Sequence, residues 1–196
     1  IMFSVYEFNK RLLAVLPENL SVWATRHLAN RGIDIHTGAG IKEVHADHVV
    51  DSDGNVVPCS TVIWTAGISP SPALKQLDGL PLNKFGGLQC QSDYQVVDTD
   101  NIWGMGDCAS VEGRNGKPMP PLAQIAIRQA PQVAANIAAV ENGRPTKPGG
   151  VELQGVLVPL GRHRGVAAIK GIRIHGFLAW AMWRAIYLLK TPRLGR

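Results

Sequence analysis

The chain has 196 residues, of which 45% are hydrophobic and 18% are charged, so its composition is that of a globular protein and excludes an intrinsically disordered one. No apolar run reaches the roughly 20 residues that a membrane-spanning helix needs, and the first residues show no signal-peptide pattern. Cys59, Cys90 and Cys108 have no CxxC spacing, so neither a zinc site nor a redox disulfide is predicted, and reduced, cytosol-facing thiols are the simplest interpretation.

Charge is distributed unevenly along the chain. Residues 161–196 carry eight basic residues and no acid, which leaves a net −3 for residues 1–160 because the total is +5. Such a basic end predicts an anionic partner, either a membrane surface or a nucleic acid. The segment has no base-reading motif, so no nucleic-acid partner is expected.

The first third of the chain alternates between strand-like and helix-like patterns. Met2–Glu7 is an apolar run closed by an acid, and Pro17 with Glu18 predicts the start of a helix that stops at Gly32. The other predicted elements of this part are strands at 33–36, 41–46 and 48–50, a returning segment at 55–58 after an Asp53–Gly54 turn, and a buried strand at 61–64. This order predicts an α/β unit with a small β insertion.

The histidines of this part suggest a metal site only at first sight. His27, His36, His45 and His48 fit no common ligand spacing, and two of them lie on one hairpin face. Polar surface is the preferred interpretation, and no metal ion is expected.

A less regular part follows. Ser69–Pro72 is typical of a stiff linker, and it leads into a short helix at 73–77 and a loop at 79–87. Weak strands are expected at 88–90 and 94–97.

The most informative stretch is NIWGMGDCAS, residues 101–110. It predicts a short buried strand that ends in a glycine turn, because Gly104 and Gly106 let the backbone turn and let a ligand approach closely. Asp107 would then lie at the carboxyl end of the strand, where open α/β sheets bind ligands, and its carboxylate would accept hydrogen bonds from a polyhydroxyl chain or a ribose. The alternative is a structural turn with an N-cap aspartate.

The last third predicts two helices separated by a β pair. Alanine-rich residues 122–140 predict a helix that packs closely against a sheet or a flat ligand, with a kink or restart at Pro131, which lacks an amide donor. The predicted β pair is 151–158 with 166–172, and a helix runs from His175 to about Lys190.

The closing helix has an aromatic face. Trp180, Trp183 and Tyr187 recur at steps of three and four residues, and the apolar run of 14 residues from Gly176 to Leu189 is too short to span a bilayer. With the flanking basic residues, this pattern predicts a helix that lies in the headgroup layer of an anionic leaflet. The alternative is a helix buried in a dimer or domain interface.

Several blocks in this order resemble a known family. They are an acid after the first strand (Glu7), VIWTAGISP (62–70), NIWGMGDCA (101–109), PPLAQIAIRQ (120–129), LGRHRGVA (160–167) and GFLAWAMWRAIYLLK (176–190). The chain resembles the two-dinucleotide-domain flavoprotein disulfide reductase superfamily and, within it, the type II NADH dehydrogenases, whose AQxAxxQ signature is similar to 123–129.

The resemblance implies a fold and a domain division. The expected fold is α/β, a partial flavoprotein with two Rossmann-like dinucleotide-binding domains and a C-terminal amphipathic helix. Residues 1–78 would belong to the NADH-binding domain, 79–150 to the FAD-binding domain, and 151–196 to a β pair with a membrane-associated helix. No G-x-G-x-x-G turn is present, so the chain is expected to be a C-terminal fragment that is inactive alone.

The resemblance also implies roles for individual residues. Glu7 would bind the adenosine ribose of NAD(H) and favour NADH over NADPH, and Ala66 and Gly67 would let the backbone approach the dinucleotide. Gly106 and Asp107 would hold the ribityl chain of FAD.

The start of the 122–140 helix receives two further implied roles. Ala123 and Gln124 would donate to the pyrimidine edge of the flavin, and Gln124 and Gln129 would contact the quinone. Helix surface is the alternative for both glutamines, and no side chain is predicted to be an acid–base catalyst.

The implied function is electron transfer from NADH through FAD to a membrane quinone in a respiratory chain. The expected partners are the quinone and, through Gly161–Arg196, an anionic membrane surface, and the resemblance allows a homodimer. The expected location is the cytoplasmic face of the membrane, as a peripheral protein. Two alternatives remain: a soluble reductase of the same superfamily that acts on a protein or disulfide, and a non-enzymatic membrane-docking module.

Overall fold

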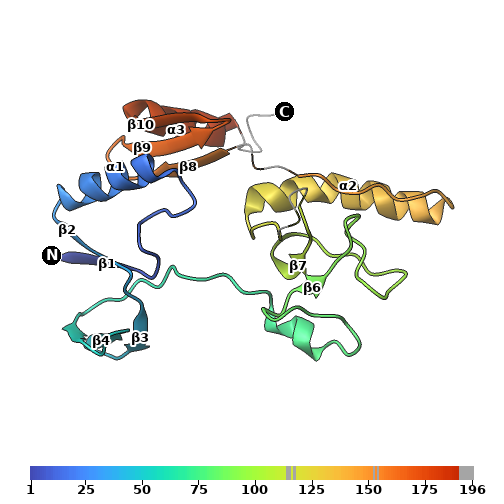
Figure 1. The fold of residues 1–196 in the computed structure, drawn as a ribbon, viewed down its shortest axis with the longest axis horizontal. Coiled ribbons are helices and arrows are strands. Elements are labelled where there is room, and N and C mark those ends of the chain that lie inside the picture. The colour runs from blue at the N-terminus through green and yellow to red at the C-terminus, as the bar shows by residue number, and fades with distance from the viewer. Residues whose placement is uncertain (114–115, 117, 152, 154, 190–196) are drawn as a thin grey trace. The chain divides into compact units, whose positions relative to one another are not determined.

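The computed structural model describes residues 1–113, 116, 118–151, 153 and 155–189, which form two compact α/β units (Figure 1). Unit 1 consists of Ile1–Trp64 with Gln154–Arg196, and unit 2 of Thr65–Leu153. The predicted α/β class is confirmed. The predicted domain boundaries at 78 and 150 concern the complete flavoprotein domains and stay a prediction.

Unit 1 begins with a parallel β–α–β element. β1 (Phe3–Glu7) and β2 (Ile33–Thr37) pair in register from Phe3 opposite Ile33 to Glu7 opposite Thr37, and α1 (Glu18–Ala29) connects them. α1 begins directly after Pro17, as predicted, because the fixed φ of proline suits a helix start and Glu18 favours the helix dipole.

Unit 1 ends with an antiparallel sheet covered by a helix. The strands are β8 (Gly155–Pro159), β9 (Gly165–Ile169) and β10 (Ile172–Gly176), in the order β10-β9-β8, and α3 (Phe177–Leu189) follows. The sequence predicted two strands in this region and the structure has three, so the prediction of a β pair was wrong by one strand. Lys170 and Gly171 both have positive φ (47° and 85°), so the chain reverses in a two-residue turn and a third strand forms where a helix was expected from His175.

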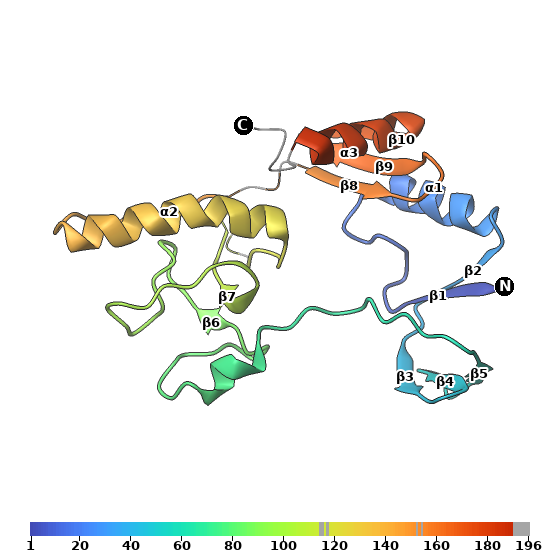
Figure 2. The same ribbon diagram turned by 180° about the vertical axis from the view of Figure 1, so that it is seen from behind.

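The core of unit 1 joins α1 to this sheet, and the two lie side by side in Figures 1 and 2. Leu16, Leu20 and Ala24 are buried against Val166 of β9. At the edge of this core, the Trp23 ring stacks on His27 at 5.1 Å and on His175 of β10 at 4.7 Å between ring centroids. Residues more than 130 positions apart therefore share one hydrophobic core.

The β insertion of unit 1 is a three-stranded antiparallel meander. β3 (Ile41–Val44), β4 (His48–Asp51) and β5 (Val56–Pro58) form it, and the predicted turn at Asp53–Gly54 is confirmed. Asp51 fixes this turn, because its carboxylate accepts hydrogen bonds from the amides of Asp53 (2.9 Å) and Asn55 (2.8 Å).

The predicted buried strand at 61–64 was wrong. These residues form no strand, and the side chains of Ile63 and Trp64 are 80% and 61% exposed. A buried strand needs a neighbouring strand for its backbone hydrogen bonds, and in the described part of the chain β1 and β2 pair with each other alone.

Unit 2 packs short strands and turns against one long helix. Its elements are η1 (Pro72–Gln76), β6 (Leu88–Gln89), η2 (Gly106–Cys108), β7 (Ala109–Ser110) and α2 (Ala123–Glu141). Tyr94, Val111 and Val133 are buried together, and Trp103 and Met105 pack on them. The predicted strand before Asp107 is extended backbone with a single bridge, Gln95 to Trp103, and Asp107 lies in the 3₁₀ turn that follows.

The sequence predicted a kink or a restart at Pro131, and α2 runs through Pro131 without a restart. Its buried residues, Ile125, Gln129, Val133 and Asn136, lie on one face on both sides of the proline, whereas Pro131 itself is exposed. Continuous packing of that face offsets the one backbone bond that proline removes.

The far end of α2 is tied to the following segment through Asn136, which is 1% exposed. Its Nδ2 donates to the carbonyls of Asp93 (2.9 Å) and Lys147 (2.8 Å), and its Oδ1 accepts from the Lys147 amide (3.0 Å). One side chain thus satisfies three backbone groups from two loops.

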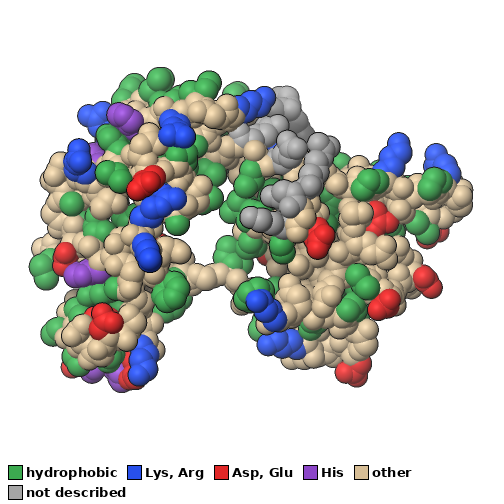
Figure 3. Space-filling view, viewed as in Figure 1, with side chains coloured by type: hydrophobic (Ala, Val, Ile, Leu, Met, Phe, Trp, Pro, Cys, Tyr) green, Lys and Arg blue, Asp and Glu red, His purple; other side chains and the backbone are tan. Residues whose placement is uncertain are grey.

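The outer face of α3 is apolar. Its exposed hydrophobic side chains include Phe177, Leu178, Tyr187 and Leu189, and Figure 3 shows hydrophobic groups gathered over this helix at the top of the view. Within the described ranges, no helix combines the length and apolar character that crossing a bilayer requires. The predicted membrane contact also includes residues 190–196, which lie outside the described residues.

Candidate functional site

The glycine turn of unit 2 is shaped by two close contacts. A Cβ on Gly104 would lie 2.7 Å from Cys90 Sγ and 3.1 Å from the Ala109 Cβ, so no larger residue fits there. Gly106 has a φ of +64°, a conformation that favours glycine. The turn presents Asp107 with an exposed side chain.

Cys90, the neighbour of this turn, is a packing residue. Burial, with a smaller effect of Cys108, raises the pKa of the Cys90 thiol to about 11. The thiol is therefore protonated at neutral pH and acts as a small apolar group against Gly104.

The glycine turn is fixed to α2 by a hydrogen bond and by a close contact. The Gly106 amide donates to Gln129 Oε1 at 2.7 Å, and Gln129 is 2% exposed. A Cβ on Gly106 would lie 3.1 Å from the Ala126 Cβ. The structure therefore brings the Asp107 turn against the first two turns of α2.

The start of α2 is suited to an electron-rich group. The helix begins at Ala123, which is exposed, with Gln124 half-buried behind it. Among the described residues, no side chain caps this end and no acid lies in its first turn. Ala123 is about 4.5 Å along the helix axis from Ala126, since each residue rises about 1.5 Å. The positive end of the helix dipole thus lies close to the Asp107 turn.

Glu7 in unit 1 occupies the carboxyl end of the parallel pair β1–β2. Its Oε1 accepts hydrogen bonds from the Asn9 amide (2.8 Å) and from Asn9 Nδ2 (2.6 Å). Ligands of α/β sheets bind at this end of the strands. Asn9, two residues further along the chain, therefore orients the predicted ribose acceptor.

Ala66 and Gly67 lie in unit 2, in a segment without regular structure, and both are exposed. Gly67 has a φ of +82°, which favours glycine, and a Cβ there would meet no atom within 4 Å. The open surroundings agree with a backbone that a ligand could approach, but the assigned role stays a prediction.

The remaining predicted site residues differ in how far their side chains are exposed to solvent. Asp107, Ala123 and Gln124 have accessible surface, whereas Gln129 is buried and hydrogen-bonded to Gly106. The contact of Gln129 with Gly106 and the orienting role of Asn9 were not predicted from the sequence. The Glu-x-Asn spacing could have indicated Asn9, because asparagine side chains often bond to backbone and side chains two residues away.

Two histidines of unit 1 pair with acids that lie two residues before them in the sequence. His36 lies 2.8 Å from Asp34 and His45 lies 3.0 Å from Glu43, between ring nitrogen and carboxylate oxygen. Within the described residues, no three His, Cys, Asp or Glu side chains gather as metal ligands would.

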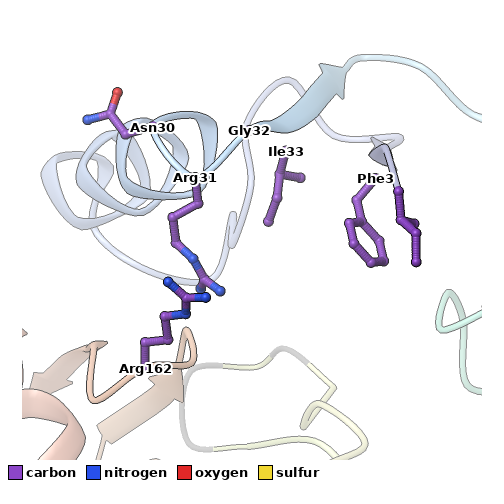
Figure 4. A pocket seen from close by; sticks show the side chains of 7 residues that line it. Phe3, Asn30, Arg31, Gly32, Ile33 and Arg162 are labelled. Carbon is purple, nitrogen blue, oxygen red and sulfur yellow. The ribbon is translucent and has the colours of Figure 1, made fainter.

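A separate cavity of ≈ 570 Å³ lies in unit 1 (Figure 4). Its lining includes Phe3 and Ile33 of the parallel pair, and the Arg31 and Arg162 side chains extend toward each other across it. Arg31 is held by a hydrogen bond from Nη1 to the Leu160 carbonyl (2.9 Å). None of the predicted site residues lines this cavity.

The residues of the Asp107 turn fit the flavin end of FAD. An exposed carboxylate accepts hydrogen bonds from ribityl hydroxyls, and an uncapped helix start donates to acceptor atoms at the pyrimidine edge of the ring, where negative charge develops on reduction. The glycine-rich turn that binds a pyrophosphate is absent from this sequence, so the fit extends to the flavin end alone.

Comparisons with known proteins agree with this arrangement. The chain is 31% identical over 169 residues to the type II NADH:quinone oxidoreductase of Haemophilus influenzae, covering 86% of this chain and 38% of that protein. It is 31% identical over 191 residues to the demethylphylloquinone reductase NdbB of a Synechocystis species, covering 96% of this chain and 47% of that protein. The chain thus spans less than half the length of these curated relatives.

The fold comparison gives the same result. The structure of NDH2 from Plasmodium falciparum in complex with NADH superposes with a TM-score of 0.84 at 16% identity, covering 96% of this chain and 54% of that one. This likeness confirms the predicted Rossmann-like fold. The family profile of the pyridine nucleotide-disulphide oxidoreductases matches residues 3–130, which is more than half of the chain. The chain therefore belongs to the pyridine nucleotide-disulphide oxidoreductase family.

Proposed function

We propose that this chain is the C-terminal part of an FAD-dependent NADH:quinone oxidoreductase. The observation that carries the proposal is the docking of the Asp107 turn on α2, with Gly106 hydrogen-bonded to Gln129 at 2.7 Å. This contact holds an acceptor for the ribityl chain near a helix start that can donate to the flavin ring. The names and similarities of the relatives support the same reaction.

Each proposed role follows from the chemistry of the group. When bound, FAD would accept a hydride from NADH and pass two electrons to the quinone. The Asp107 carboxylate would accept hydrogen bonds from ribityl hydroxyls, and the amides at Ala123 and Gln124 would stabilise negative charge on the ring. The half-buried Gln124 side chain is a candidate donor to a quinone oxygen.

The NADH contact is assigned to unit 1. Glu7 would accept hydrogen bonds from both hydroxyls of the adenosine ribose and repel a 2′-phosphate. Asn9 donates twice to Oε1, which leaves Oε2 of Glu7 for the ligand. Ala66 and Gly67 would let the backbone approach the dinucleotide.

The membrane contact is assigned to α3 and the basic end of the chain. Phe177, Leu178 and Leu189 are exposed, and residues 161–196 carry eight cations and no acid. An exposed apolar helix beside cations suits the headgroup region of an anionic leaflet. We place the protein as a peripheral protein on the cytoplasmic face; a homodimer through α3 is the competing use of this surface.

The flavin assignment is tested in the complete protein expressed from the full gene. Asp107→Ala is expected to lower the FAD recovered per polypeptide, measured from the flavin absorbance after purification. Asp100→Ala, which changes an exposed acid in a loop of the same unit, is the matched control and should keep wild-type flavin content. Equal flavin content in Asp107→Ala and wild type would remove the role assigned to Asp107.

The membrane assignment has a separate test. The complete protein should bind vesicles with anionic headgroups and be released by salt, because charge attraction is screened. A soluble reductase that acts on a protein or disulfide would remain in the supernatant at low salt. A docking module without enzymatic function would bind vesicles but purify without flavin.

A further inference from the structure

Gln129 makes a contact that its place in the AQxAxxQ signature does not explain. The side chain is 2% exposed, and its Oε1 accepts the Gly106 amide at 2.7 Å. Its Nε2 points to the Met119 sulfur at 3.9 Å, at the long end of a weak hydrogen bond. The acceptor end of the carboxamide is therefore engaged with the glycine turn inside unit 2.

The geometry of the turn shows what this bond does. Gly106 has a left-handed φ of +64° and rests on Ala126, which lies three residues before Gln129 on the same face of α2. The contact at Ala126 limits how closely the turn can approach the helix, and the bond to Gln129 limits how far it can move away. Asp107 is the next residue along the chain, so its backbone position depends on this pair of contacts.

We propose that Gln129 is a positioning residue for the flavin site, which holds the Asp107 turn at a fixed distance from the start of α2. This inference rests on the proposed function, because it acts through the assigned contact of Asp107 with the ribityl chain. Gln129 then affects quinone reduction through flavin binding. A direct quinone contact, which the sequence resemblance implied for Gln129, would require the buried carboxamide to leave Gly106.

The first test measures the bond in the 196-residue chain itself. Gln129→Met keeps a similar side-chain length and removes the oxygen acceptor, and the Gly106 amide is expected to exchange with solvent roughly tenfold faster, the effect of losing one hydrogen bond. Gln129→Glu keeps an acceptor oxygen and should restore slow exchange. Gln132→Met, one turn further along the same helix, is the matched control. Unchanged exchange at Gly106 in Gln129→Met would overturn the positioning role, whatever the complete protein does.

The second test uses the complete protein. Gln129→Met should raise the Kd for FAD roughly tenfold, as expected from one weakened hydrogen-bonding group, and the KM for quinone should be unchanged once FAD is saturating. Gln129→Glu should return the FAD affinity toward wild type. A raised KM for quinone with wild-type FAD affinity would reject the inference in favour of direct quinone contact.

A second variant covers the case in which Gln129→Met does not fold. Ala126→Val keeps Gln129 and adds two methyl groups toward Gly106, so it should press the turn away from α2 and also weaken FAD binding. Unchanged FAD affinity in Ala126→Val would count against positioning. The two proposals fail separately: Asp107→Ala with full flavin content removes the flavin assignment, whereas slow Gly106 exchange in Gln129→Met removes the positioning role alone.

Discussion

Removal of the Asn136 carboxamide should destabilise unit 2 more than removal of the carboxamide from an exposed asparagine. The side chain is 1% exposed and pairs with the carbonyls of Asp93 and Lys147 and with the Lys147 amide, at 2.8 to 3.0 Å. Asn136→Ala leaves these three backbone groups without that partner. If two of them stay unsatisfied at about 1–3 kcal/mol each, the free energy of unfolding should fall by about 2–6 kcal/mol.

The assay is urea unfolding followed by hydrogen exchange of the 144–149 segment, which reports on unit 2. Asn142→Ala is the matched control, because Asn142 is exposed at the end of the same helix and its Nδ2 bonds to the Ala138 carbonyl of its own helix. We expect a change within about 0.5 kcal/mol for that control, as for most surface substitutions. A loss below about 1 kcal/mol for Asn136→Ala would show that water or loop movement satisfies the freed groups, which would refute the reasoning.

Three further predictions concern the two cores and one histidine. Burial, followed by two neighbouring arginines, lowers the pKa of His27 below 6.5, so the unfolded chain binds more protons than the folded chain just below pH 6.5. Stability should therefore be full above pH 6.5 and fall as the pH drops toward the folded pKa, and His27→Gln should flatten that dependence in urea unfolding at stepped pH. Gly149→Ala would place a Cβ well inside van der Waals contact with the buried Tyr94 hydroxyl, so thermal unfolding should show a loss of about 1–3 kcal/mol. An unchanged melting temperature would contradict this packing. Leu20→Ala, at a fully buried position, should cost about 2–5 kcal/mol in urea unfolding, whereas Val22→Ala, at a 49% exposed position, should stay within about 1 kcal/mol.

The elements that the sequence predicted well depend on local chemistry. α1 starts after Pro17 and the β insertion turns at Asp53–Gly54, because proline, glycine and aspartate act on the backbone within a few residues. Two of the predictions that were wrong, the strand at 61–64 and a restart at Pro131, depend on contacts elsewhere in the chain. The run at 61–64 has strand-like residues but pairs with none of the strands in the described part of the chain. α2 continues through Pro131 because its buried face packs on both sides of the proline.

In the candidate site, too, the feature set by local sequence could be predicted and the feature set by a distant contact could not. Asp107 could be singled out from the sequence because it follows an apolar run and a glycine turn, and ligands of open α/β sheets bind at the carboxyl ends of the strands. That Gly106 would be tied to Gln129 could not, because the bond joins residues 23 positions apart and depends on how α2 packs. The signature residues alone do not tell which glutamine faces a ligand and which faces the protein.

The two predicted acceptor carboxylates differ in the contacts that position them: those of Glu7 are local in the sequence, and those of the Asp107 turn are long-range. Glu7 is oriented by Asn9, two residues away, so its geometry depends on β1 and the following turn. The backbone turn that carries Asp107 is held against α2 through Gly106, so its position depends on the tertiary packing of unit 2. Changes that loosen α2, such as Asn136→Ala, should therefore weaken FAD binding while the Glu7–Asn9 hydrogen bonds persist. Loss of FAD affinity without a change in the Asn9 side-chain amide resonances, measured by NMR on the same variant, would show that the two acceptors are positioned independently. A change in the Asn9 resonances would instead show that the two positions are coupled.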